Sequence, residues 1–326
     1  MNRTGLCNLG NTCYLNTVVQ CLRHCPDFAR FMRTSSAPSA DKPQSKVFTE
    51  LRRTFKALNA RNAKEQQTPY SPTLFVKSVL QYAATKKDSQ FVDFRQNDAH
   101  EFLIFLIECL HDGIKKSVTI KINGVVKNER DKHIKDGMVS FSKFYKNEYS
   151  KLIHQFFGQY QSCVHYTEKN ELSYTYEPFM CLQLEIPPRL RRPTIYDCLI
   201  HFTSTEKLND STYKGICLWN TPQYLVCCLK RFVPRGKNIA PVHIPLTLNL
   251  REFTNGPNKY DQSVYELIAV CNHSGRRSGG HYYAFCRDAQ KKWWVYNDAS
   301  VREISAQSVS TPNAYCVFYS KISKAS

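Results

Sequence analysis

The sequence lacks the features that would place it quickly in several classes of protein. No two cysteines have the CxxC spacing of a zinc site, and no stretch approaches the roughly 18 consecutive apolar residues of a membrane span. A turn-rich segment begins at residue 5, which leaves no room for a secretory signal peptide. We therefore expect a protein with no metal, no cofactor and no membrane span, located in the cytoplasm or the nucleus.

Acidic residues are also scarce: 27 Asp and Glu against 45 Lys and Arg give a formal net charge of +18. A field of this sign favours acidic partners, with nucleic acid or chromatin as one candidate. However, no helix-turn-helix, zinc-finger or RNA-recognition signature accompanies the charge, so a solvated basic surface is the alternative. The basic clusters are short and lie at Arg189, Arg191 and Arg192 and at Lys230, Arg231, Arg235 and Lys237.

The sequence does contain enough apolar residues for a full core, because 42% of its 326 residues are hydrophobic. The 14 cysteines are scattered singly in apolar runs rather than at the spacings of a disulfide framework, so most are expected to be buried reduced thiols. Cys21 and Cys25 flank His24, but this spacing on an apolar helix indicates core packing. We predict no metal there.

Apolar residues recur with helical periodicity in the first half of the chain. The first helix has Thr12 as a candidate N-cap and is followed by Pro26, which is expected to end it. A loop follows at 34–46. The third helix is expected to have Ser71 as its cap and Pro72 at its first helical position. The expected helices span residues 12–25, 47–59, 71–85 and 98–111.

The second half is rich in strand patterns. The charged segment 118–137 contains Asn123 and Gly124, a dipeptide typical of a hairpin turn. A helical half followed by an antiparallel half predicts an α+β fold, and a cleft between two such lobes is a natural place for a site. The expected strands are separated by Gly, Pro and Asn clusters and lie at 180–186, 223–231, 264–273, 281–287, 293–297 and 314–321.

The segment "NLGNT" directly before Cys13 must form a tight turn. If the helix begins at Thr12 or Cys13, the thiol lies among unpaired N–H groups at the positive end of the helix dipole, which stabilises a thiolate. The turn also offers amide donors from the backbone and from Asn8, as an oxyanion hole requires. Cys13 is thus a candidate nucleophile, with a packed core thiol as the alternative.

A nucleophilic cysteine needs a base, and His281 is the candidate among ten histidines. It follows Gly279 and Gly280 at the head of a strand, where the side chain can face a cleft while the glycines let another backbone approach. If the next hairpin turn is centred just after residue 289, His281 faces Asp298, with Asn297 as the neighbour. Such a group would accept a hydrogen bond from the imidazole Nδ1–H and complete a papain-like triad by role.

Three segments resemble, in order and spacing, the cysteine, glutamine and histidine boxes of the ubiquitin-specific protease family of deubiquitinases. They are "GLCNLGNTCYLNT", "RQNDAHEFLIFLI" and "SGGHYYAFCR" followed by "WWVYNDAS". The resemblance runs from about Gly5 to Tyr319. Shorter landmarks of the family occur at 154–160, 177–187 and 224–232. Three boxes in the correct order across the whole chain make this resemblance specific.

The resemblance implies roles for the candidate residues. By position, Cys13 would be the nucleophile, Asn8 the oxyanion-hole side chain and His281 the general base. The third member of the triad falls on Asn297, with Asp298 adjacent, whereas the hairpin pairing above favours Asp298. Both residues therefore stay candidates.

The glutamine box is similar to the helix start that holds the carboxy-terminal tail of ubiquitin in this family. Gln96, Asp98 and Glu101 are the candidates, since carboxylates in the first turn of a helix suit the arginines of the tail. The carboxylates could instead cap their own helix. In the histidine box the substrate-binding candidates are Gly279, Gly280 and Tyr282.

The resemblance also implies a papain-like peptidase fold with thumb, palm and fingers. Many family members hold zinc in the fingers through two CxxC pairs. Here Tyr166 and Lys169 stand at the first pair, and the second is shortened away between Asn209 and Leu225, which implies small, zinc-free fingers. The parts of this single catalytic domain are a helical thumb at about 1–140, fingers and the start of the palm at about 141–235, and the palm at about 236–326.

The leading hypothesis is a deubiquitinase, a monomeric thiol hydrolase that acts on ubiquitin and ubiquitinated proteins at ubiquitin's terminal glycine. One alternative is a protease for another ubiquitin-like modifier. Another is a catalytically idle ubiquitin-binding scaffold, against which the intact Cys13, Asn8 and His281 argue. A basic nucleic-acid-binding protein is supported by net charge alone.

Overall fold

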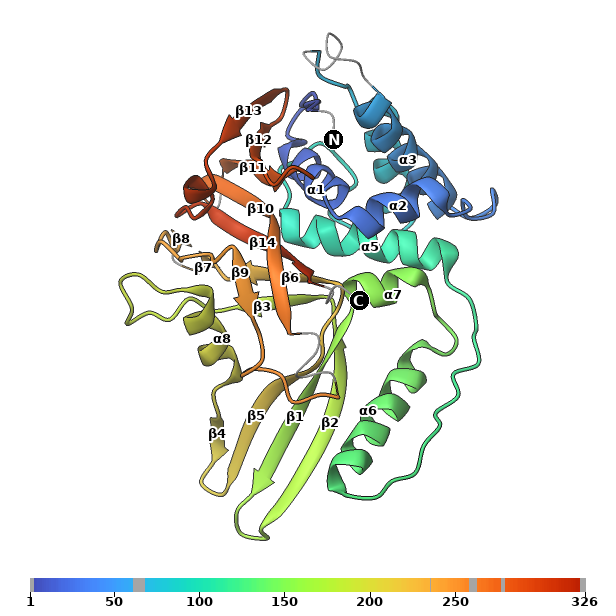
Figure 1. The fold of residues 1–326 in the computed structure, drawn as a ribbon. Helices are drawn as coiled ribbons and strands as arrows, with labels where there is room; N and C mark the ends of the chain where they lie inside the picture. Colours follow the sequence, from blue (N-terminus) through green and yellow to red (C-terminus); the bar gives the residue numbers. More distant parts are fainter. Residues whose placement is uncertain (1–2, 61–67, 235, 258–262, 277–278, 323–326) are drawn as a thin grey trace. The chain divides into compact units, whose positions relative to one another are not determined.

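The computed structural model describes residues 3–60, 68–234, 236–257, 263–276 and 279–322, which mix helices and strands throughout (Figure 1). The chain divides into two compact units. The first comprises Met1–Ile114, Lys230–Pro241 and Ile268–Phe318, and the second comprises Lys115–Leu229, Val242–Leu267 and Tyr319–Ser326. Among the described residues, no helix has both the length and the apolar content that crossing a bilayer requires.

The central helix of the first unit is α1, which packs against α2 and α5 and in which every residue is buried, including the polar Asn16 and Gln20. Aromatic rings fill the space beside it; the Tyr14 and Phe102 ring centroids lie 5.2 Å apart in an edge-to-face contact. A helix that is buried on all sides needs packing partners on each of its faces. The helices are α1 (Cys13–Arg23), α2 (Pro26–Thr34), α3 (Gln44–Ala60), α4 (Thr73–Ala83) and α5 (Ala99–Ile114).

The two prolines have different roles from those predicted. Pro26 does not end the first helix but opens α2, because α1 has already ended at Arg23 and a proline is tolerated where its missing N–H would be unpaired. Pro72 is the N-cap of α4 rather than its first residue. The next difference is at α3, which starts at Gln44, inside the predicted loop.

An antiparallel sheet in the first unit carries the histidine box. Its strand order is β13-β12-β11-β10-β14, and α1 lies against β11 and β12 (Figure 1). β10 begins and β14 ends in residues of the second unit. The strands are β10 (Val264–Arg276), β11 (Gly279–Arg287), β12 (Trp293–Asn297), β13 (Ser300–Ile304) and β14 (Ala314–Lys321), with a separate small hairpin of β7 (Phe232–Val233) and β8 (Gly236–Lys237).

The second unit contains a four-stranded antiparallel sheet of order β2-β1-β5-β4, covered on one face by α6. Gly137 of α6 allows this packing, because an added Cβ would collide with the Trp219 ring. β3 and β6 form a parallel pair. The elements are α6 (Glu129–Tyr145), α7 (Lys151–Phe156), β1 (Gly158–Tyr166), β2 (Glu171–Phe179), β3 (Cys181–Leu184), α8 (Ile195–Thr203), β4 (Glu206–Asn209), β5 (Thr212–Asn220), β6 (Tyr224–Leu229) and β9 (Thr247–Asn249).

The hairpin predicted at Asn123 and Gly124 does not form. These residues lie in irregular chain, and helix α6 follows them. The helix begins after Asn128, whose side chain accepts a hydrogen bond from Asp131 N. An asparagine cap with acidic residues in the first turn favours a helix start. Val125 and Val126, which follow the Asn-Gly pair, break the apolar–polar alternation that a second hairpin strand needs, so the dipeptide alone was misleading.

Hydrogen bonds join the tips of the four-stranded sheet. Thr167 begins the β1–β2 turn, and its backbone N–H and Oγ1 both donate to Ser211 O, at 2.8 and 3.0 Å. Ser211 lies in the tight β4–β5 turn, because Asn209 pairs with Thr212 there. The two CxxC pairs of many family members are expected at these turns. In this structure the two turns contact each other directly.

Removal of divalent metal is expected to leave the protein folded, because the Thr167–Ser211 bonds join the tips without cysteine ligands. The thermal unfolding midpoint should be the same before and after dialysis against EDTA. Thr167→Ala, which deletes the Oγ1 bond, should lower the midpoint by about 2–4 °C. The exposed Thr175→Ala on β2 is the matched control. Stoichiometric zinc in the purified protein, or a lower midpoint after dialysis, would contradict this account.

Candidate active site

A tight turn delivers Cys13 to the first position of α1. The Asn8 side chain closes this turn, since its Oδ1 accepts hydrogen bonds from Gly10 N and Thr12 N, both at 3.1 Å. Gly10 and Asn11 have φ values of 100° and 53°, in the left-handed region that glycine and asparagine adopt most readily. The glycine and asparagine before the cysteine are therefore required by the backbone geometry of the turn.

The Cys13 thiol is nearly inaccessible, with 4% of the residue exposed. Burial, together with a smaller effect of the Asp298 charge, raises the pKa of Cys13, although backbone N–H groups of Tyr282 and Tyr14 oppose the shift. The helix start acts in the predicted direction, since the N–H groups of Tyr14 and Cys13 lower the pKa, but the net shift in the protein alone is upward. The N–H groups are in place, but desolvation is the larger effect, so a base must remove the proton at neutral pH.

The group formed by Cys21, His24 and Cys25 belongs to the core, as predicted. The two cysteines are fully buried free thiols. His24 Nδ1 lies 2.7 Å from Gln20 O, one turn earlier in α1. Burial lowers the pKa of His24 to about 3, so the ring is neutral in the folded protein. These residues support α1 from behind Cys13.

The His281 imidazole is held by Asn297. Its Nε2 lies 2.5 Å from Asn297 Oδ1 and 3.9 Å from Asp298 Oδ2. The nearer acceptor therefore engages Nε2, whereas an acceptor at Nδ1 was predicted. When Nε2–H donates to the amide oxygen, the lone pair of the neutral ring is on Nδ1. The ring is thus oriented with its basic nitrogen available.

The β11–β12 hairpin has a register one residue away from the predicted one. Cys286 pairs with Trp294, so the predicted pairing of the histidine with residue 298 is wrong. The reason is the turn: Asp288 N donates to Lys292 O at 2.9 Å, which encloses a three-residue loop. Lys291 in this loop has a φ of 62°, the left-handed residue that completes such hairpins.

The Asp298 side chain connects the hairpin to the turn before Cys13. Its Oδ2 accepts a hydrogen bond from Asn8 Nδ2 at 2.9 Å, and its Oδ1 accepts one from Asn16 Nδ2 at 2.8 Å. Its backbone oxygen accepts a third, from Leu6 N at 2.8 Å. Asp298 therefore positions the Asn8 amide, while Asn297 positions the imidazole. The two candidates for one role have different roles in the geometry.

Asn16 was not predicted as a site residue. It lies one turn after Cys13 on α1, is buried, and donates both to Asp298 and to Cys7 O, the latter at 3.2 Å. An amide inside an otherwise apolar helical stripe was the available signal. Gly5 allows the same approach of chains, because an added Cβ would collide with the backbone of Asp298 and Ala299.

The glutamine box meets the histidine box. Gln96 Nε2 donates to Gly280 O at 3.4 Å. Asp98 caps α5 by accepting from His100 N at 2.7 Å, and it also accepts from the Tyr315 hydroxyl at 2.7 Å. The capping alternative for Asp98 thus describes its contacts in this structure. Burial raises the Asp98 pKa, and the bonds from Tyr315 and from the helix N–H groups oppose the shift.

The other predicted substrate-binding residues differ in their exposure and in the space around them. Glu101 is exposed and accepts a hydrogen bond from Gln90. Gly280 must be glycine, because an added Cβ would collide with the His273 ring, whereas Gly279 has open space at that position. Tyr282 is 6% exposed and packs against the same histidine, with ring centroids 4.6 Å apart. Of the two glycines, only Gly279 leaves room for another backbone.

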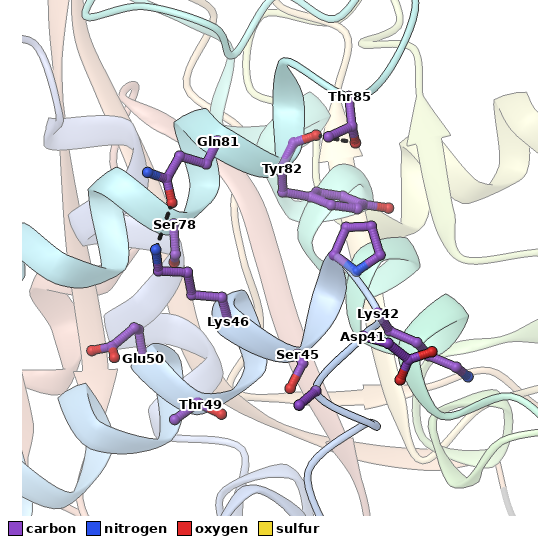
Figure 2. Close-up of a pocket in the computed structure, with 12 residues that line it drawn as sticks. Asp41, Lys42, Ser45, Lys46, Thr49, Glu50, Ser78, Gln81, Tyr82 and Thr85 are labelled. Carbon is purple, nitrogen blue, oxygen red and sulfur yellow. Dashed lines mark hydrogen bonds between the residues drawn. The ribbon is translucent and has the colours of Figure 1, made fainter.

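A separate cavity of about 540 Å³ lies between α3 and α4 and contains none of the predicted site residues (Figure 2). Lys46 Nζ donates to Gln81 Oε1 across it, at 2.8 Å. The hydroxyls of Ser45, Ser78 and Thr85 donate to backbone carbonyls at 3.1, 2.7 and 2.7 Å. Because these polar groups are matched within the protein, the cavity is not a candidate catalytic centre.

Comparison with known proteins points to one family. The sequence profile described as ubiquitin carboxyl-terminal hydrolase matches residues 4–319. Ubiquitin carboxyl-terminal hydrolase 2 of Bos taurus is 31% identical over 339 residues, covering 97% of this chain and 54% of that protein. Ubiquitin carboxyl-terminal hydrolase 21 of Homo sapiens is 32% identical over 357 residues, covering 97% and 61%. The chain thus spans little more than half the length of these relatives.

Solved structures of the family share the fold. A chain of the SAGA DUB module of Ubp8, Sgf11, Sus1 and Sgf73 bound to monoubiquitin has a TM-score of 0.76 and 25% identity, over 100% of this chain and 71% of that one. A structure of that module bound to ubiquitin aldehyde has a TM-score of 0.75 and 24% identity, over 100% and 71%. The predicted α+β fold class is confirmed by this likeness.

Asn297→Ala and Asp298→Ala are expected to shift the pH dependence of Cys13 alkylation in opposite directions. Without Asn297 the His281 ring is free to turn, so the thiolate loses a positioned cationic partner and alkylation should move to higher pH. Without the Asp298 charge one cause of the raised Cys13 pKa disappears, so alkylation should move to lower pH. Iodoacetamide labelling, quantified by peptide mass spectrometry across pH, measures both shifts.

Labelling of the partly exposed Cys163, in the second unit, should be the same in both variants and serves as the internal control. A shift to higher pH for Asp298→Ala with none for Asn297→Ala would show that Asp298 orients the imidazole and would overturn the assignment. No shift in either variant would mean that His281 is held by packing alone.

Proposed function

Because the chain belongs to the ubiquitin carboxyl-terminal hydrolase family, we propose that it hydrolyses the peptide or isopeptide bond after the terminal glycine of ubiquitin. The reaction passes through a thioester on Cys13. The observation that carries the proposal is the pairing of His281 Nε2 with Asn297 Oδ1 at 2.5 Å, which leaves Nδ1 as the base for a neighbouring thiol. Ubiquitin and ubiquitinated proteins are the proposed substrates.

Proton transfer from Cys13 to His281 Nδ1 is the first step. Because burial raises the thiol pKa, the thiolate forms as the imidazolium forms, rather than in advance of it. Asn297 Oδ1 accepts the Nε2–H bond both before and after this transfer, so the ring keeps one orientation throughout. The thiolate then attacks the carbonyl carbon of the terminal glycine of ubiquitin.

The developing oxyanion needs donors fixed before the reaction. Asn8 Nδ2 carries two N–H bonds, and one of them is donated to Asp298. The other is proposed to stabilise the oxyanion, together with the Cys13 N–H at the start of α1. Loss of one such donor typically lowers kcat by about 10²–10³. Asp298 thus contributes by fixing the direction of the Asn8 amide.

The remaining steps reuse the same imidazole. His281 donates its proton to the leaving amine, which departs and leaves ubiquitin bound as a thioester to Cys13. Nδ1 then removes a proton from water, the hydroxide attacks the thioester carbonyl, and the tetrahedral intermediate releases ubiquitin with a free carboxylate. The thiol regains its proton from the imidazolium, which restores the resting site.

The tail of ubiquitin is proposed to approach along the glutamine and histidine boxes. Gly279 offers open space for an extended backbone, and Gln96 adjoins it through Gly280. Glu101 is the better placed carboxylate for the tail's arginines, because it is exposed, whereas Asp98 already accepts bonds from its own helix and from Tyr315. Tyr282 is almost fully buried and packs against His273, so it offers little surface to the tail.

Incubation with ubiquitin that carries an electrophile at its terminal glycine should give one covalent adduct, on Cys13, visible as a mass increase of the intact protein. Cys13→Ala should form no adduct but bind ubiquitin at least as tightly as the unaltered protein, because the nucleophile contributes to the chemistry and little to ground-state binding. Cys163→Ala, on the second unit, is the matched control and should react normally.

Failure of the freshly reduced protein to form the adduct would reject the proposal. An adduct with a probe built on another ubiquitin-like modifier, but none with ubiquitin, would reassign the substrate. Loss of ubiquitin binding together with reactivity in Cys13→Ala would mean that Cys13 is a structural residue.

A further inference from the structure

The two basic clusters of the sequence differ in how the fold uses them. In the second cluster, Arg231 is fully buried and its Nε donates to Ala314 O at 2.5 Å. Lys237 Nζ donates to His273 O, also at 2.5 Å. Arg235 lies outside the described residues. Arg231 and Lys237 therefore bind backbone carbonyls of their own unit, whereas Lys230 of the same cluster is exposed.

The first cluster is left to the solvent. Arg189, Arg191 and Arg192 are all exposed, and among the described residues no carboxylate forms an ion pair with any of them. Three guanidinium groups within four positions repel one another in the free protein. An acidic ligand would relieve that repulsion and gain bidentate hydrogen bonds.

The loop that carries these arginines, residues 187–193 and hereafter the arginine loop, is stiff and anchored at both ends. Prolines stand at its first, second and last positions and fix φ there. It follows β3 and leads into α8 (Figure 1), whose first turn is held by a capping box of Thr194 and Asp197. Pro193 O also accepts a hydrogen bond from His243 N at 2.8 Å. Less entropy is lost on binding when a loop is already ordered.

Apolar side chains accompany the charge. Leu190, in the middle of the arginine loop, is 45% exposed, and Ile200, on the helix that follows, is 58% exposed. The phosphates of a nucleic acid would match the arginines but would leave Leu190, which lies between them in the chain, in water. A protein segment can satisfy both, because it offers carboxylates and apolar side chains together.

We propose that the arginine loop is a docking site for an acidic segment of a partner protein that also carries an aliphatic side chain. The carboxylates of the segment bind Arg189, Arg191 and Arg192, and its apolar side chain covers Leu190. This role goes beyond the proposed hydrolysis and does not depend on it, since none of these residues belongs to the site around Cys13. It would supply a second point of contact for a substrate or a regulator.

Fluorescence anisotropy with a fluorescein-labelled peptide of glutamate and leucine measures this binding directly. Replacing Arg189, Arg191 and Arg192 together by Gln should weaken binding about tenfold, since each exposed ion pair contributes a few-fold. The control variant Lys121→Gln, Lys127→Gln and Lys135→Gln removes the same charge from exposed positions of the same unit and should change binding by less than about twofold. Leu190→Ser should weaken the leucine-containing peptide but not a glutamate-only peptide.

Equal weakening by the two triple variants would show a general effect of net charge and overturn the proposal. Tighter binding of duplex DNA than of the acidic peptide would identify a nucleic-acid surface instead, and no saturable binding of the peptide at low salt would reject docking altogether. The arginine variant should still react normally with the ubiquitin electrophile. A protein that binds the peptide but forms no adduct would reject the hydrolysis and leave the docking site standing.

Discussion

The carboxylate of Asp298 holds together parts of the chain that are 290 positions apart. One oxygen fixes the Asn8 amide in the turn before α1, and the other fixes Asn16 within α1. The Leu6 N–H bond to its backbone adds a third tie, and Gly5 lets the two chains approach. Cys13 is on α1 and His281 is on β11, and the bonds of Asp298 connect the β11–β12 hairpin to the turn before Cys13.

The same carboxylate has an electrostatic cost. Its charge adds to burial in raising the pKa of Cys13, so the group that positions the Asn8 amide also disfavours the thiolate. His281 lies beside the same charge, with its Nε2 3.9 Å from Asp298 Oδ2. The site therefore combines a shielded thiol of raised pKa with an imidazole whose orientation is fixed by Asn297.

The residues of the site differ in how well the sequence alone predicts them. Cys13 and His281 could be proposed from turn chemistry and strand position, since both signals are local. The hairpin register could not, because it depends on Lys291 adopting a left-handed conformation that few lysines adopt. The division of roles between Asn297 and Asp298 follows from that register. Asn16 was not predicted because its hydrogen-bond partner, Asp298, lies in a distant segment of the chain. Only the fold brings the two residues together.

Larger elements show the same limit. The central helix and the strands β3, β6, β10, β11, β12 and β14 lie near their predicted positions, because their apolar periodicity reflects burial on defined faces. Helix α6 and the β1–β2 and β4–β5 hairpins were not predicted as such. Their outer faces are exposed and charged, so the apolar pattern is weak. Their stability comes from contacts such as that of Gly137 with Trp219, between residues remote in sequence.

A double-mutant cycle between Asn16 and Asp298 tests the central connection most directly. The kcat/KM for ubiquitin with a fluorogenic amide at its terminal glycine would be measured for Asn16→Ala, Asp298→Ala and the double variant. If the carboxylate acts through its bond to Asn16, the double variant should be little worse than the more damaged single variant, with a coupling energy of about 1 kcal/mol or more. Losses that simply add would contradict the account, because they would show that the two residues contribute to the site independently.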